Sequence, residues 1–378
     1  MTHDDTQNIP GQESKDHEIY VASQWTLMWR RFRKHRMAMV AGVVLICIYL
    51  TGAFCEFLAP NDPNEHNTRL VYAPPQRLRF VGEEGFSLRP FVYGYKSQRD
   101  PVTLQRVHTI NKEDVRPIRF FVRGHSYRLL GLFETDIHLF GIDEGKVFLL
   151  GTDRLGRDML SRILYGTRIS TSIGLIGVFF SLILGIIIGG ISGYYGGVVD
   201  TVIQRLIEVL RSIPTIPLWM GLSAALPPHW PPLRVYFGIT IILSLIGWTG
   251  LARVVRSKFI SLREEEFVMA AKIGGTKEIR IITHHMVPSF MSHIIASVTL
   301  SIPGMILGET SLSFLGLGLR SPVISWGVLM QEAQNVQTVA LYPWLLLPTV
   351  FVVVTVLAFN FLGDGLRDAA DPYGSWGG

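Results

Sequence analysis

The run ISTSIGLIGVFFSLILGIIIGGISGYYGGVV, residues 169–199, contains no aspartate, glutamate, lysine or arginine. A helix of about 20 apolar residues is long enough to cross the hydrocarbon core of a bilayer. The stretch 333–363 lacks the same four residue types. Only 17% of the 378 residues are charged and 48% are hydrophobic, whereas soluble domains carry about 25% charged residues. The sequence therefore predicts an all-α protein that crosses a membrane several times.

Apolar segments on either side of this run predict six membrane spans. We place them at 37–58 and at about 169–193, 213–230, 235–252, 289–317 and 341–362. The residues WTLMWRRFRKHR at 25–36 mix tryptophan with cations, a pattern typical of the cytoplasmic end of a span. Six spans return the chain to the side on which it starts. We therefore expect tails 1–36 and 366–378 in the cytoplasm and a transmembrane core at 169–365.

The segment 59–150 interrupts the apolar pattern after the first span. It opens with the turn-forming cluster APNDP at 59–63, and short alternating stretches near glycines follow. These features predict a small β-rich or mixed insertion. Loops of this length are exported largely regardless of their charge, so we expect it outside the cytoplasm. In residues 151–168 apolar positions share one helical face and arginines fill the other, which predicts an amphipathic helix at the outer interface.

The connection 253–288 between the fourth and fifth predicted spans is rich in lysine and arginine, as cytoplasmic loops are. A short helix is predicted up to Ile273, because good helix formers precede a stop at Gly274 and Gly275. Thr276 is suited to cap a second helix. A projecting helix of this kind either receives force from a soluble partner or is an ordinary structured loop. These residues by themselves leave both interpretations open.

The run EFVMAAKIGG at 266–275, followed by HMVP at 285–288, resembles the "EAA" loop of permease subunits of binding-protein-dependent ABC importers. Met269 stands where that motif has its glutamate, and His285 stands where an aliphatic residue is usual. Further motifs are similar to the dipeptide/oligopeptide branch of the family. They are LGTD at 150–153, GRD at 156–158, YG at 165–166, RIS at 168–170, GYYGG at 193–197, LSFLGLG at 312–318, SWG at 325–327, GDGLRD at 363–368 and DP at 371–372.

The resemblance implies a type I ABC importer transmembrane domain in a bacterial inner membrane. It implies half of a translocation pathway shared with a second homologous permease, two docked ABC ATPase subunits and an extracytoplasmic solute-binding protein. The docking helix would be about 263–275. The residues that the resemblance assigns to ATPase docking are Glu266, Phe267, Ala270, Ala271 and Gly275. The solute would be a peptide, with nickel, sugar-derived or opine-like solutes as the alternative.

No Gly-x4-Gly-Lys-Ser/Thr phosphate loop occurs in the sequence. We therefore expect no enzyme activity and no bound cofactor in this chain, with ATP and Mg used by partner subunits. No histidine or cysteine spacing suits a metal site. The net charge of +5 fits cytoplasmic loops better than nucleic-acid binding. A stand-alone secondary transporter, or a membrane-anchored enzyme with its site in 59–150, is a less favoured alternative.

Several residues within the predicted spans are candidates for either helix packing or the solute pathway. Gly185, Gly189 and Gly193 recur every four residues, which allows another helix to approach closely. Pro303 interrupts the backbone hydrogen bonding of the fifth span. Glu309 lies in the same span and requires a partner or a cavity, because a carboxylate is costly within the membrane. The sequence leaves both roles open for each residue.

Overall fold

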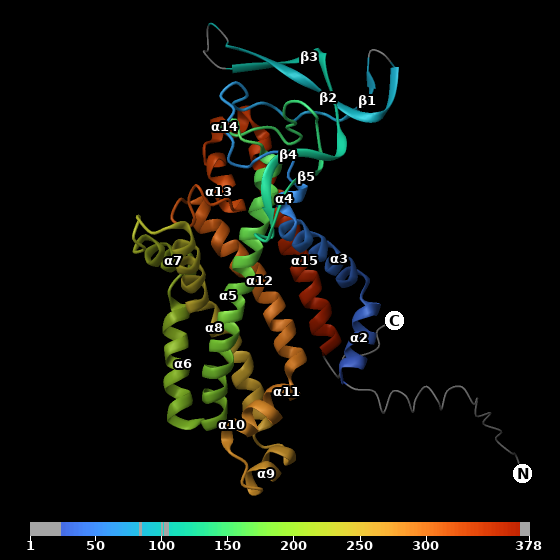
Figure 1. Ribbon diagram of the computed structural model, residues 1–378. Helices are drawn as coiled ribbons and strands as arrows, with labels where there is room; N and C mark the ends of the chain where they lie inside the picture. Colours follow the sequence, from blue (N-terminus) through green and yellow to red (C-terminus); the bar gives the residue numbers. More distant parts are fainter. Residues whose placement is uncertain (1–23, 83–84, 100, 102–105, 371–378) are drawn as a thin grey trace, which may run out of the picture.

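A bundle of long helices makes up most of the protein, with β-strands at one end (Figure 1). The computed structural model describes residues 24–82, 85–99, 101 and 106–370. Among these residues five helices are long and apolar enough to cross a bilayer. They are α3 (Arg36–Ala53), α5 (Met159–Tyr195), α8 (Pro232–Leu262), α12 (Met291–Phe314) and α15 (Leu347–Ala370). The prediction of a mainly helical chain with several membrane-crossing helices is confirmed.

Helix α5 is much longer than one crossing requires. Its 37 residues extend about 55 Å, against roughly 30 Å for the hydrocarbon core. Asp158 caps its start by accepting hydrogen bonds from the backbone N–H groups of Leu160 at 3.3 Å and Ser161 at 3.1 Å. The separate amphipathic helix predicted over 151–168 is therefore wrong. The residues before Met159 form a turn, and those after it are the first turns of α5.

The third predicted span is also wrong. Within 213–230 the structure has only α7 (Thr215–Ala224), whose 10 residues are too few to cross a bilayer. Pro214 precedes this helix and Pro227 follows it, and proline cannot continue the hydrogen-bonding pattern of a helix. Helix α6 (Gly197–Ser212) comes before α7. Figure 1 shows the two in series along one side of the bundle.

Shorter helical elements lie between and beside the long helices. They are α2 (Gln24–Lys34), α4 (Cys55–Leu58), α9 (Glu266–Ile273), α10 (Glu278–Arg280), η1 (Ile281–Met286), α11 (Val287–Ser289), α13 (Trp326–Met330), η2 (Gln331–Gln334), α14 (Val336–Leu341) and η3 (Pro343–Leu346). Helix α8 continues to Leu262, so the predicted loop 253–288 begins inside it. Most of the two predicted tails, residues 1–23 and 371–378, lies outside the described residues.

Helices α5 and α8 pack closely along a stripe of glycines. A Cβ atom added at Gly189 would lie 2.4 Å from the carbonyl oxygen of Ala252, and one at Gly193 would lie 2.6 Å from that of Arg256. At Gly185 the added atom would lie 3.0 Å from the side chain of Leu251. No side chain fits at the first two positions, so the stripe is a helix-packing surface that holds α8 against α5.

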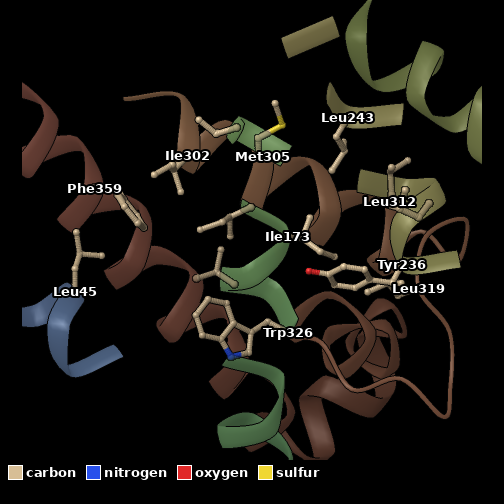
Figure 2. Close-up of a cluster of buried hydrophobic side chains, with 14 of the residues drawn as sticks. Leu45, Ile173, Tyr236, Leu243, Ile302, Met305, Leu312, Leu319, Trp326 and Phe359 are labelled. Carbon is tan, nitrogen blue, oxygen red and sulfur yellow. The ribbon is translucent and has the colours of Figure 1, made fainter. Parts of the chain in front are cut away.

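The main apolar core is formed where α5, α8, α12 and α15 meet (Figure 2). Ile173, Leu243 and Ile306 are fully buried there. Trp326, from the start of α13, is also fully buried and donates its indole N–H to the carbonyl oxygen of Ile163 at 3.3 Å. The core therefore fixes the connection between α12 and α15 as well as the long helices.

Five strands, all within the described residues between Arg79 and Gly141, form two small antiparallel sheets. One sheet has the order β1 (Arg79–Gly82), β2 (Gly85–Arg99) and β3 (Arg106–Pro117), and the other pairs β4 (Arg119–Leu129) with β5 (Phe133–Gly141). Tyr95 faces Ile110 across the first sheet. A small cluster of apolar residues joins the strands to the segment that follows them. Figure 1 shows these sheets at the end of the bundle opposite α9.

Candidate functional site

Helix α9 forms the extreme end of the bundle (Figure 1). The carbonyl oxygen of Glu265 accepts bonds from the N–H groups of Val268 and Met269, both at 3.0 Å, which starts the helix. At the other end the N–H of Gly275 donates to Lys272 O at 3.0 Å and that of Thr276 to Ala271 O at 3.1 Å. This pair of bonds is a Schellman stop, with Gly275 in the left-handed region at φ +71°.

The inner side of α9 is anchored to the long helices. Val268 is fully buried, and Ala271 is half-buried beside it. Both pack against an apolar cluster that includes Phe259 of α8, Met286 of η1 and Ile294 of α12. Because protein interiors are close-packed, a displacement of α9 is passed to these elements.

The outer side of α9 presents an apolar surface to solvent. We call Phe267, Met269, Ala270 and Ile273 the α9 patch; the three larger side chains are 42%, 50% and 89% exposed respectively, and Ala270 is exposed as well. An exposed apolar cluster with charged neighbours is typical of an interaction site.

The residues that the sequence assigned to docking do not share one face of α9. Glu266, Phe267, Ala270 and Gly275 are exposed, whereas Ala271 packs inward. Met269 and Ile273 belong to the exposed side and were missing from the sequence prediction, although their helical spacing from Glu266 was the signal that could have identified them.

Two polar contacts join the C-terminal end of α5 to α9 and to the segment that follows α9. The Lys272 ammonium group lies 5.0 Å from the ring centroid of Tyr194. The hydroxyl of Tyr195 donates to a carboxylate oxygen of Glu278 at 2.8 Å. Helix α5 therefore contacts the chain on both sides of the Gly274–Gly275 turn.

An ion pair ties α6 to α8 near the same end. The guanidinium group of Arg256 donates two hydrogen bonds to the Asp200 carboxylate, each at 2.5 Å. Such two-pronged pairs fix the relative orientation of the groups they join. Ser192 of α5 also donates to Asp200. These contacts thus link helices α5, α6 and α8 to one another.

Glu309 of α12 is fully buried and accepts hydrogen bonds from three serine hydroxyl groups. The donors are Ser313 of α12 at 2.8 Å, Ser325 at 2.7 Å and Ser170 of α5 at 3.1 Å. Ser325 also caps α13. This network joins α5, α12 and α13, so Glu309 has the partners that a buried carboxyl group requires. Pro303 is buried in the same helix, which continues through it.

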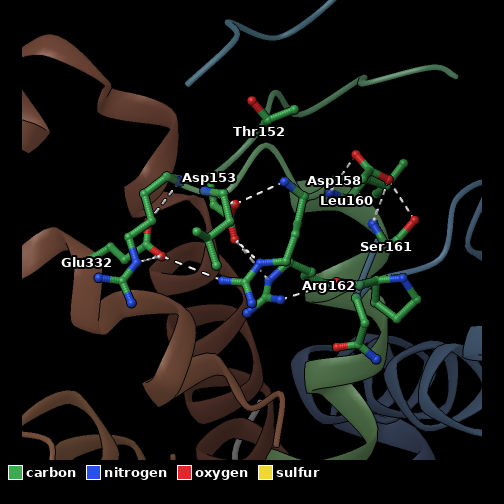
Figure 3. Close-up of polar contacts among 12 residues, drawn as sticks. Thr152, Asp153, Asp158, Leu160, Ser161, Arg162 and Glu332 are labelled. Carbon is green, nitrogen blue, oxygen red and sulfur yellow. Dashed lines mark hydrogen bonds and ion pairs between the residues drawn. The ribbon is translucent and has the colours of Figure 1, made fainter. Parts of the chain in front are cut away.

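A second polar network lies at the start of α5 (Figure 3). Asp153 accepts from the N–H groups of Leu155 at 2.8 Å and Arg157 at 3.0 Å, and from the Arg157 guanidinium group at 2.7 Å. Arg162 lies 3.5 Å from the same carboxylate. Glu332 of η2 pairs with Arg154 at 3.3 Å, and burial raises the pKa of Glu332. Arginines predicted to face an interface are therefore held by acidic partners.

The described part of the chain contains no cluster of three or more histidine, cysteine, aspartate or glutamate side chains suited to a metal ion.

Comparison with protein families gives two matches. The family described as "Binding-protein-dependent transport system inner membrane component" matches residues 181–373. The family described as "N-terminal TM domain of oligopeptide transport permease C" matches residues 23–75. Together these matches cover the first long helix and most of the bundle.

Curated relatives are similar over most of the chain. The dipeptide transport system permease protein DppC of Lactococcus lactis is 31% identical over 351 residues, which are 92% of this chain and 90% of the relative. The oligopeptide transport system permease protein OppC of Haemophilus influenzae is 42% identical over 59% of this chain and 69% of its own length. DppC of Bacillus subtilis is 39% identical over 59% of this chain and 68% of its own length.

Among solved structures, an inward-facing conformation of the MetNI methionine ABC transporter aligns with 56% of this chain and 97% of its own, at 16% identity and a TM-score of 0.42.

Proposed function

Because the chain belongs to the family of binding-protein-dependent transport system inner membrane components, we propose that it is the permease subunit of an ATP-driven importer of dipeptides or oligopeptides. The names of its relatives support the solute class, since they are dipeptide and oligopeptide permeases. They do not favour a nickel, sugar-derived or opine-like solute. Membership of this family of permease subunits also argues against a stand-alone secondary transporter or a membrane-anchored enzyme.

The observation that best supports this function is the exposed α9 patch, which lies on a helix whose other side is buried in the bundle. An apolar outer face fits a groove on a soluble ATPase subunit, and Glu266 would meet polar groups at its rim. Val268 and Ala271 would pass a movement of the ATPase to α8 and α12. ATP and Mg belong to the partner subunits in this scheme, so the chain converts a mechanical stroke rather than catalysing a reaction.

The same scheme sets the topology. α9 and the strands lie at opposite ends of the bundle (Figure 1), so a cytoplasmic α9 leaves the strands outside the cytoplasm. Five crossings are the five long helices. The remaining one, third along the chain, would be α6 and α7 in series, broken at Pro214, rather than one helix over 213–230. Six crossings of a bacterial inner membrane would leave both termini in the cytoplasm.

The permease would form half of the translocation pathway. Its partners would be a second homologous permease, two ABC ATPase subunits and an extracytoplasmic solute-binding protein, all assembled around the lipid bilayer. Helix α8 packs directly against Gly185, Gly189 and Gly193. This contact supports a helix-packing role for the three glycines and not a role in the solute pathway.

The test is to change the α9 patch alone. In the double variant Phe267→Asp, Ile273→Asp we expect loss of ATPase co-purification and of ATP-driven peptide uptake in proteoliposomes, because two carboxylates would be desolvated in the groove. Val336→Asp is the matched control, since Val336 is 83% exposed on α14 toward the other end; it should retain the ATPase. A double variant that binds the ATPase and imports peptide normally would contradict the docking assignment.

A further inference from the structure

A cavity of about 440 Å³ lies in the strand region, between residues 74–79 and strands β2 and β3. The residues that matter for its chemistry are Arg77, Arg79, Tyr93, Tyr95 and His108. Concave sites of a few hundred Å³ are the usual size for small ligands, whereas protein partners cover broader and flatter surfaces. The cavity is thus sized for a small molecule.

Hydrogen bonds hold the walls of this cavity in place. The His108 Nε2 atom lies 2.8 Å from the carbonyl oxygen of Val71. The Tyr95 hydroxyl donates to Pro75 O at 3.2 Å, and the Gln76 side-chain amide donates to Tyr93 O at 3.0 Å. The segment before Arg77 is therefore fastened across β2 and β3, and a ligand would meet a formed site.

The cavity carries positive charge on aromatic walls. The Arg79 guanidinium carbon lies 5.3 Å from the ring centroid of Tyr93, which supports that side chain along the wall. Burial raises the pKa of Tyr95, and the nearby charge of Arg77 opposes that rise. The described residues that line the cavity include no aspartate or glutamate. Among the described residues, neither Arg77 nor Arg79 forms an ion pair with a carboxylate within 4.0 Å.

Two guanidinium groups with no acidic partner among the described residues attract an anion, and their fork geometry suits a carboxylate. Tyrosine rings provide apolar contact area for a side chain or a peptide plane. A short peptide has both features, a terminal carboxylate and apolar side chains. We propose that this cavity is a peptide-binding site in the strand region, which holds the terminal carboxylate at Arg77 and Arg79 and the side chains against Tyr93 and Tyr95. Its ligand class rests on the proposed function.

Binding is measured by calorimetry on the full-length permease in lipid nanodiscs. The probes are the tripeptide alanyl-phenylalanyl-alanine, its C-terminal amide and inorganic phosphate. We expect saturable binding of the free acid and at least tenfold weaker binding of the amide, because the amide lacks the charge that the arginines hold. Equal affinity for acid and amide would overturn the proposal, and this comparison needs no variant. Displacement of the tripeptide by phosphate at equal concentration would also overturn the proposal, because the cavity would then be a general anion site.

The double variant Arg77→Gln, Arg79→Gln should bind the free acid at least tenfold more weakly. Arg89→Gln, Arg128→Gln is the matched control, because both arginines are exposed on other parts of the strands; its affinity should equal that of the unmodified chain. Unchanged binding in the first variant would overturn the site. Peptide uptake by the unmodified complex is recorded separately. Uptake without binding at the cavity contradicts this inference alone, whereas a complex that imports no peptide contradicts the proposed function.

Discussion

Glu56 and Arg168 form a two-pronged ion pair that no local pattern in the sequence could identify. Two guanidinium nitrogens each lie 2.5 Å from a Glu56 carboxylate oxygen, across 112 residues of chain. Arg168 also donates to the carbonyl oxygens of Gly52 and Ala53, both at 2.8 Å. These bonds satisfy the free carbonyl groups at the end of α3. A single arginine of α5 therefore caps the end of the first long helix.

Glu309 is the residue at which a packing role and a pathway role can be separated. Glu309→Leu should lower the free energy of unfolding by about 3 kcal/mol, because three serine hydroxyl groups lose their acceptor inside the bundle. Glu309→Gln keeps one acceptor oxygen and should cost less. The measurement is denaturant unfolding in detergent micelles.

Peptide uptake by the same two variants completes the test of Glu309. If the residue acts through packing, uptake should fall only in proportion to the folded fraction. A stable Glu309→Gln protein that imports no peptide would contradict that role and assign the carboxylate to the pathway.

At the scale of elements, the length of α9 is set by the turn that follows it. Gly275 adopts φ +71° while the preceding Gly274 adopts φ −71°. A side chain at the first position costs about 1–2 kcal/mol, because the left-handed region is unfavourable for L-residues. Nothing lies within 4 Å of a Cβ atom added there, so the cost comes from the backbone and not from a clash.

Gly275→Val should therefore weaken the stop of α9 and uncouple ATP hydrolysis from peptide uptake. Gly274→Ala is the matched control, since its backbone angle is one that alanine adopts readily, and it should couple normally. The measurement is the number of peptides imported per ATP hydrolysed in proteoliposomes. Equal coupling ratios for the two variants would contradict a role for the geometry of this turn.

The sequence predicted those elements whose determinants are local. The Gly274–Gly275 stop and the apolar runs are of this kind, and the structure has a helix long enough to cross a bilayer at each predicted span except the third. The helix predicted over 151–168 was wrong because Arg157 and Arg162, two of the arginines that suggested an interfacial face, are buried. Both lie beside Asp153, and Arg157 also lies 3.8 Å from the distant Glu332. The inward orientation of Ala271 depends on α8 and η1, so helical periodicity could not reveal it.

At the scale of the whole molecule, two ends with different chemistry are joined by closely packed helices. The α9 patch is apolar and lies at one end, whereas the strands at the other end carry the cavity lined by Arg77 and Arg79. Helices α5 and α8 run between them, in contact along the glycine stripe. Because that contact leaves no room for side chains, α5 and α8 should move as one body when α9 is displaced.

This arrangement predicts that the strand region can be removed without loss of the bundle. The backbone N–H of Gln76 donates to Phe148 O at 2.9 Å, so a diglycine linker in place of residues 77–146 bridges two neighbouring points. The Thr152 hydroxyl group would still donate to Leu70 O at 2.5 Å and accept from the Ala73 N–H at 2.7 Å. The start of α5 should therefore remain fixed.

We expect the shortened chain to insert in the membrane and to co-purify with the ATPase, because α9 lies at the opposite end from the deletion. Peptide uptake should be lost, since the deletion removes the cavity that we propose as a peptide-binding site. Size-exclusion chromatography, ATPase co-purification and proteoliposome uptake are compared on one preparation. Normal uptake would mean that the strands are dispensable for transport, and loss of the ATPase would mean that the two ends are not mechanically separate.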